Sequence, residues 1–290
     1  RDAHRVWNPT AQPWEEVKTV MAPAFQPGGM VTLSARPRAF LSGYGLGVAG
    51  AILALVLTGA VFLLLGVLST VGLEASVPLS VNLVIAFVFG QYVPFMGFPL
   101  AYFRRRRQMT WEDIREYVGV RVPSLAEAGL VLGGLIAVFV LVSAMAFLVQ
   151  TLGLDPASNN AGEIAQETPS IAPVLALASL VVIGPCEEML FRGTVQNRLR
   201  EAFSAPVAIT LAAVLFASIH VTALTGGLGA RFTTIGILLV PSFVFGVTYE
   251  YTQNLVVPAL VHGLWNAFLF TSIWIASQAD LPTGAVLLWV

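Results

Sequence analysis

The side chains best suited to chemistry lie in three short motifs within apolar stretches of the second half of the chain. Each motif places two side chains four residues apart: Glu188 with Arg192, Phe216 with His220, and His262 with Asn266. Residues at this spacing share one face of a helix. An ionisable group inside a membrane span costs about 2.5–3.5 kcal/mol on insertion scales, so such groups indicate function.

These residues could activate a water molecule. The carboxylate of Glu187 beside the neutral imidazole of His220 could take a proton from water. His262 and Asn266, on one helix face, could donate hydrogen bonds to a developing oxyanion. The alternative is that the polar groups only hold helices together. Because these polar side chains are numerous and lie in three neighbouring segments, the sequence favours a functional site.

An antiparallel helix hairpin would bring two of these groups together. Glu187 lies 16 residues before Phe203, and His220 lies 17 residues after it. Helices that rise about 1.5 Å per residue would therefore hold both at similar depth. Pro258, four residues before His262, suits the first turn of the last helix. The span limits given below place His220 deeper than Glu187, so hydropathy leaves their relative depth open.

The elements that must position these residues are membrane-spanning helices. Of the 290 residues, 57% are hydrophobic and 11% charged, whereas soluble domains carry about 25% charged residues. A spanning helix needs about 20 apolar residues. Seven segments meet this requirement: Tyr44–Val71, Ser80–Phe103, Leu125–Leu152, Ile171–Phe191, Ala205–Thr225, Phe232–Tyr251 and Val256–Ala276. The sequence predicts an all-α, polytopic membrane helical bundle with about seven to eight transmembrane helices.

The basic residues predict the orientation of these helices. Of the 15 Lys and Arg residues, all except Arg231 fall on one side of the membrane if the seven spans alternate. The opposite side carries an acidic loop with Asp155, Glu163 and Glu167. The excess of positive charge marks the cytoplasmic side. We therefore expect a multi-pass protein of the cell membrane with a cytoplasmic N-terminus.

Several segments outside the spans have a distinct composition. The run Arg104–Arg107 followed by Trp111–Tyr117 predicts a short amphipathic helix at the basic surface.

Small residues within spans, at Gly66, Gly133 and Gly134, indicate close helix packing. The predicted organisation is an N-terminal arm (1–43), a three-helix region (44–152) with a basic loop (104–124), an acidic loop (153–170), a core (171–276) and a tail or partial eighth helix (277–290). A net charge of −1 argues against a nucleic-acid partner.

At the three motifs the sequence resembles the CPBP family, the CAAX-type and bacteriocin-processing intramembrane proteases also called the ABI family. The family pattern is EExxxR, FxxxH and HxxxN, and all three elements are present in order within residues 187–266. The resemblance implies hydrolysis of a peptide bond in a peptide or membrane-protein substrate, at a site opening to the cytoplasm. It implies these roles: a general base at Glu187, an orienting group for water at His220, oxyanion donors at His262 and Asn266, and braces of the fourth helix at Glu188 and Arg192.

Four alternatives accompany this interpretation. Glu187, His220 and His262 could mimic a zinc-binding set, but Asn266 suits an oxyanion donor and is a poor zinc ligand, so we expect no cofactor. Cys186 could be taken for a nucleophile, but the adjacent carboxylates disfavour its thiolate, so we expect a small buried residue. The chain could also be a non-catalytic membrane scaffold or regulator that binds a cell-envelope protein. A transporter is disfavoured, since the polar residues cluster towards one side and no inverted repeat is seen.

Overall fold

Residues 34–70 and 78–279 are described by a computed structural model, and over these residues the chain is helical with no β-strand. Seven helices are long and apolar enough to span a membrane: Ala35–Thr70, Ser80–Arg105, Leu125–Thr151, Pro169–Arg200, Ala205–Ala223, Leu228–Thr252 and Val256–Gln278. The predicted all-α membrane bundle is thereby confirmed. Most of the predicted N-terminal arm and the tail at 281–290 lie outside the described residues.

Several spans are built from consecutive helical segments of different winding. The first four spans and the helices between them are α2 (Ala35–Thr70), α3 (Leu79–Ile85), η1 (Ala86–Gly97), α4 (Phe98–Arg105), α5 (Trp111–Val118), α6 (Leu125–Thr151), α7 (Asn160–Glu167), η2 (Pro169–Ile171), α8 (Ala172–Ala178), η3 (Ser179–Ile183), α9 (Gly184–Leu190), η4 (Phe191–Gln196) and α10 (Asn197–Arg200). The last three spans are α11 (Ala205–Ile219) with η5 (His220–Ala223), α12 (Leu228–Thr252) and α13 (Val256–Gln278). The segments η1, η3 and η4 are π-helical, and η2 and η5 are 3₁₀-helical.

Two helices extend nine residues beyond one of their predicted limits. The first begins at Ala35 instead of Tyr44, so it includes the end of the predicted arm, and the fourth runs on to Arg200 instead of Phe191. These extensions hold each other in place, since the guanidinium of Arg198 donates to the hydroxyl of Ser42 at 2.9 Å. Hydropathy ends a span at the first charges, whereas the helix continues beyond the apolar layer.

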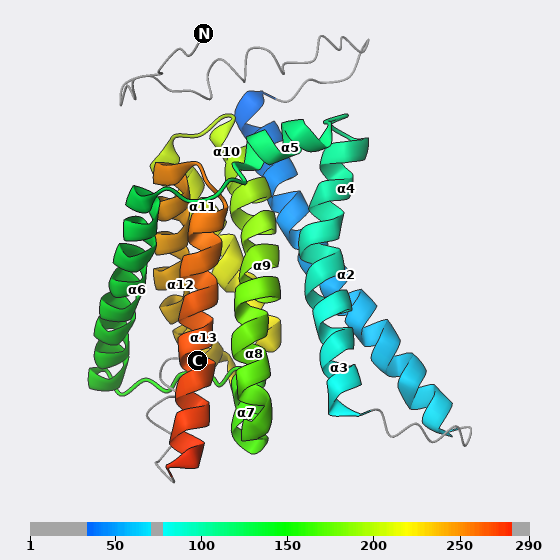
Figure 1. The fold of residues 1–290 in the computed structure, drawn as a ribbon, viewed down its shortest axis with the longest axis vertical. Coiled ribbons are helices and arrows are strands. Elements are labelled where there is room, and N and C mark those ends of the chain that lie inside the picture. Colours follow the sequence, from blue (N-terminus) through cyan, green and yellow to red (C-terminus); the bar gives the residue numbers. More distant parts are fainter. Residues whose placement is uncertain (1–33, 71–77, 280–290) are drawn as a thin grey trace.

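The two ends of the bundle differ in charge, and Figure 1 shows the helices that lie at each end. One end, called the arginine-rich end, carries residues 104–107, 115, 121, 198 and 200 and the short helix α5. The other, called the acidic-loop end, carries residues 153–170 with α7. Helix α5 matches the predicted amphipathic helix: Thr110 and Asp113 form a capping box at its start, and Ile114 and Val118 are its buried residues.

Within the described range, helix α2 has buried residues only in its first half. A Cβ atom at Gly47 would lie 2.5 Å from Leu215 Cδ2, and one at Gly50 would lie 2.8 Å from Leu190 Cδ2. The buried residues of α2 are Ala39, Gly43, Gly47 and Gly50. Beyond Gly50 the helix leans away from the bundle towards the acidic-loop end (Figure 1).

The glycines predicted to mark helix packing only partly do so. A Cβ atom at Gly66 or at Gly133 would have no neighbour within 4 Å among the described residues, so both positions face open space. Gly134 does meet a neighbouring helix, since a Cβ there would lie 3.0 Å from Val261 Cγ2. The prediction is wrong for the first two because a glycine's presence in a span does not say which side of the helix it faces.

Helix α11 ends inside the bundle. Its 15 residues span about 22 Å, less than the roughly 30 Å of a hydrocarbon core. The chain continues as η5 and then without helix, and the backbone of this segment pairs with the acidic-loop end. Thr225 N–H donates to Ser158 O at 2.9 Å, and Leu224 forms a β-bridge with Asn159. These pairings satisfy backbone groups that lipid could not.

Candidate active site

Three predicted site residues meet beside one cavity of about 560 Å³. Glu187 comes from α9, His220 from the junction of α11 and η5, and His262 from α13. The Oε2 atom of Glu187 lies 3.8 Å from Nε2 of His262 and 4.0 Å from Nε2 of His220. The turn at residues 201–204 therefore places Glu187 and His220 at the same depth, as the hairpin geometry predicts.

The hydrogen bonds of the two imidazoles define their tautomers. His220 Nδ1 lies 2.7 Å from the carbonyl oxygen of Phe216, and His262 Nδ1 lies 2.9 Å from Oε1 of Glu188. A carbonyl and a carboxylate accept hydrogen bonds, so each Nδ1 carries the proton. In a neutral ring Nε2 then presents a lone pair towards Glu187. A water molecule between these atoms could donate to both the carboxylate and an imidazole.

The tautomer also restricts what His262 can do. With Nδ1–H committed to Glu188, its Nε2 donates a hydrogen bond only when the ring is the imidazolium ion. The carboxylate of Glu188 stabilises that positive charge by the same hydrogen bond. We infer that His262 would act on an oxyanion as a charged donor.

Glu188 and Arg192 connect three helices. They form the predicted i, i+4 ion pair, with 2.9 Å between Arg192 Nη1 and Glu188 Oε1, and both side chains are fully buried. Arg192 Nη2 also donates to the carbonyl and hydroxyl oxygens of Ser242 on α12, each at 2.7 Å. The pair thus joins the fourth span to α12 and, through His262, to α13.

Aromatic rings enclose this network. The guanidinium carbon of Arg192 lies 5.0 Å from the ring centre of Phe216 and 5.4 Å from that of Phe245. Phe245 also stacks on the His262 imidazole with 4.6 Å between ring centres, and Phe216 lies 4.6 Å from the His220 ring. The first position of the FxxxH motif therefore supports both the arginine and the histidine.

Two glycines allow α13 to approach the fourth span closely. A Cβ at Gly263 would lie 2.7 Å from the carbonyl oxygen of Ser179, and one at Gly184 would lie 2.9 Å from that of Ala259. These are backbone contacts, so a side chain at either position would force the helices apart. The close crossing brings His262, next to Gly263, within hydrogen-bonding distance of Glu188.

We expect Gly263→Ala to destabilise the protein by about 1–3 kcal/mol, the usual cost of overpacking. The added methyl group has no space between α13 and η3, whereas Gly133→Ala on α6 meets open space. The measurement is thermal unfolding of both purified variants in detergent. A Gly263→Ala protein as stable as the Gly133→Ala control would contradict the close crossing.

Asn266 and the cavity wall complete the predicted set. Asn266 lies one turn after His262 on α13 and lines the same cavity. Cys186 is buried next to Glu187. The structure therefore places Glu187, His220, His262 and Asn266 around one space, with Glu188 and Arg192 packed behind them.

Sequence reasoning missed Gln91. Its Nε2 donates to Oε1 of Glu187 at 3.1 Å, from the π-helical segment η1 that also contains Pro94. Its Oε1 is buried without a hydrogen-bond partner among the described residues. Single-turn π segments are frequent at functional sites, and two short ones, η3 and η4, flank the glutamates. A glutamine outside any motif gave no signal in the sequence.

The buried cluster contains two carboxyl groups and one guanidinium group. With both carboxylates ionised, Glu187 and Glu188 outweigh the single charge of Arg192, and the described core places no other Lys or Arg side chain in an ion pair with either glutamate. A proton on His262 would neutralise the cluster. Within the described part of the chain, no three His, Cys, Asp or Glu side chains are grouped so that they could hold a metal ion.

The cavity extends from the site towards the acidic-loop end. Its lining begins at Ala51 on α2 and at His262 on α13, and from there both helices run towards that end (Figure 1). Asn159 and Ala161, near the start of α7, form its far wall. The resemblance implied an opening on the cytoplasmic side, which the basic residues assign to the arginine-rich end. The cavity extends in the opposite direction.

The fold and the site together define a class of protein. The chain is a polytopic membrane protein that holds a buried carboxylate–imidazole centre between its spans. Residues 169–268 match the family model described as type II CAAX prenyl endopeptidase Rce1-like. The match confirms the resemblance to the CPBP family and indicates a CAAX-type protease. It covers all three motifs and leaves the first three spans outside. The comparisons with curated proteins and with solved structures gave no match.

Proposed function

We propose that the protein is an intramembrane endopeptidase that hydrolyses a peptide bond of a membrane-associated substrate with water activated by Glu187 and His220. The observation that carries this proposal is the approach of two imidazole Nε2 atoms to one Glu187 oxygen within a cavity. Such a constellation is what a general base for water requires. The family match supports the same activity.

The reaction follows from the hydrogen-bonding capacity of each group. Glu187 takes one proton from water, and the hydroxide that forms bonds through its oxygen to the carbonyl carbon. The other hydrogen stays on that oxygen and donates a hydrogen bond to His220 Nε2. The negative charge on the former carbonyl oxygen is met by the Asn266 amide and the His262 imidazolium. Glu187 then passes its proton to the amide nitrogen, and the C–N bond breaks to give a carboxylic acid and an amine.

The test compares membrane proteomes of cells carrying the wild type or Glu187→Gln. A protease should leave at least one membrane protein uncleaved in the variant, seen as a longer form with a peptide spanning the missing cut. Cells carrying Glu116→Gln, which alters an exposed carboxylate of α5, provide the matched control. Identical proteomes for all three strains would count against the proposal.

Metal dependence gives a second test of the mechanism. If Glu187 and His220 activate water directly, strong chelators should leave the cleavage rate of the purified protein largely unchanged. The rate is measured before chelation, after chelation, and after zinc is added back. Loss of activity on chelation with recovery on zinc would instead make Glu187, His220 and His262 candidate ligands.

The orientation is proposed from the distribution of basic residues, with the arginine-rich end in the cytoplasm. In a Cys186→Ala background, a cysteine at position 110 should resist a membrane-impermeant thiol reagent in intact cells, and one at position 160 should react. Both should react after the cells are opened. Reaction at 110 and protection at 160 in intact cells would invert the assignment.

A further inference from the structure

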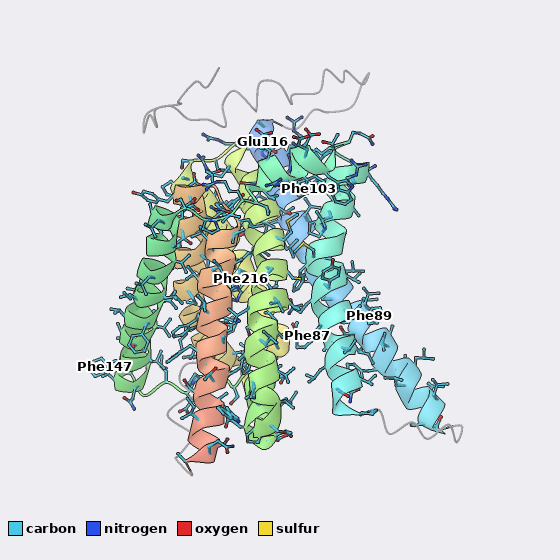
Figure 2. All side chains as sticks on the ribbon, in the orientation of Figure 1. Phe87, Phe89, Phe103, Glu116, Phe147 and Phe216 are labelled. Carbon is cyan, nitrogen blue, oxygen red and sulfur yellow. The ribbon has the colours of Figure 1, made fainter. Side chains whose placement is uncertain are left out.

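The side of the site that faces the arginine-rich end is densely packed. From Cys186 to Leu199, every residue except Asn197 is buried, and Phe191, Arg192 and Gln196 are fully so. Glu187 lies 13 residues before Arg200, which corresponds to about 20 Å of helix. Figure 2 shows Phe216, beside the site, at mid-height of the bundle and Glu116 at its arginine-rich end. A peptide arriving from that surface would meet closed packing.

The open side lies between α2 and the bundle. Ala51, Leu55 and Thr58, from the half of α2 that leans away, line one wall of the cavity, and Leu238 and Phe245 of α12 line another. No residue of α2 beyond Gly50 is buried within the described range. One wall of the cavity is therefore formed by residues of α2 that are not buried, in the half of the bundle towards the acidic-loop end.

The cavity wall fits a peptide better than a hydrocarbon chain. Its volume of about 560 Å³ is within the usual range for ligand sites. Polar side chains interrupt an otherwise apolar lining, at Thr58, Gln91, Asn159, Thr222 and Asn266. An extended backbone in the membrane needs hydrogen-bond partners for its N–H and C=O groups, and an acyl chain needs none. The unpartnered Oε1 of Gln91 is one acceptor that a peptide N–H would satisfy.

We propose that the substrate is a transmembrane segment of another membrane protein, which enters sideways from the bilayer between α2 and α12. The segment enters in the half of the membrane at the acidic-loop end, unwinds along the cavity and presents a bond near mid-depth to Glu187. This inference rests on the proposed function for the cleavage step, but binding of the segment requires no hydrolysis.

The experiment therefore uses the Glu187→Gln protein in lipid vesicles. The probe is a synthetic transmembrane peptide of about 20 apolar residues with a central Gly-Pro pair and a benzophenone photo-cross-linker beside it. After illumination, mass spectrometry should locate cross-links in residues 51–62 of α2 and 238–245 of α12. A phospholipid carrying benzophenone in its acyl chain serves as the second probe.

Two glycines of α2 provide matched variants, because both face open space in the structure. Gly59 lines the cavity and Gly66 does not. Gly59→Trp should lower the peptide cross-link yield about tenfold by filling the entrance, and Gly66→Trp should leave it unchanged. Equal yields for the two variants, cross-links confined to the arginine-rich end, or cross-linking by the phospholipid alone would each overturn the proposal. A correct cross-link pattern with no hydrolysis by the wild type would overturn only the proposed function.

Discussion

A Glu187→Gln protein is expected to lose its peptidase rate by about 10²–10⁴-fold, the usual effect of removing a general base. The glutamine keeps the size of the side chain and an oxygen that can accept the hydrogen bond from Gln91 Nε2. One of its new amide N–H groups faces Nε2 of His220, which can accept it, since His220 holds its proton on Nδ1. The fold should therefore survive while proton transfer fails.

The measurement is the cleavage rate and the thermal unfolding temperature of purified Glu187→Gln, Glu116→Gln and wild-type protein. Glu116→Gln should match the wild type in both. The same variants separate a protease from a scaffold in cells, because a scaffold needs the fold and not the base. Full complementation by Glu187→Gln and by His262→Ala, each at wild-type abundance, would contradict the protease and support the scaffold.

An Arg192→Met protein is expected to lose about 3–5 kcal/mol of stability, the usual cost of removing one partner of a buried ion pair. Methionine leaves the Glu188 carboxylate buried without its cationic partner, and it removes two hydrogen bonds to Ser242. It also removes the guanidinium group that lies against the Phe216 and Phe245 rings. This loss is a large part of a typical folding free energy of about 5–15 kcal/mol.

A double variant distinguishes the charge from the packing. Glu188→Gln in the Arg192→Met background removes the unpaired charge, so it should recover part of the lost stability. Arg115→Met, at an exposed position on α5, should change stability little. Unfolding in detergent, followed by tryptophan fluorescence, measures all of these proteins. A double variant less stable than Arg192→Met alone would show that the charge is not what destabilises it.

The parts of the fold that depend on properties of a single segment were predictable. Apolar length identifies each span without reference to its neighbours, and i, i+4 spacing identified the pairing of Glu188 with Arg192. Hairpin arms of 16 and 17 residues favoured equal depth for Glu187 and His220, although the predicted limits of the fifth span left that depth open. Each of these inferences needs only distances along one or two consecutive helices.

The missed features depend on contacts between distant segments. Gln91 reaches Glu187 from a different span, and Ser242 reaches Arg192 from another. Neither residue type stands out in an apolar stretch. The π-helical winding of η1, η3 and η4 leaves the composition unchanged, and Gly263 is a packing residue only because Ser179 lies opposite it. The direction of the cavity likewise depends on how far α2 leans from its neighbours.

In α2, different residues position the helix and line the cavity. In most helices the same residues must do both. Gly43, Gly47 and Gly50 fix the place of the helix, because any larger residue there meets a neighbouring side chain or backbone. Between Ala51 and Phe62 no residue is buried, and six of these residues line the cavity. Substitutions in this second stretch would change the shape of the cavity wall at little cost in folding free energy. The substrate preference can therefore change while the Glu187 carboxylate and the two imidazoles stay in place.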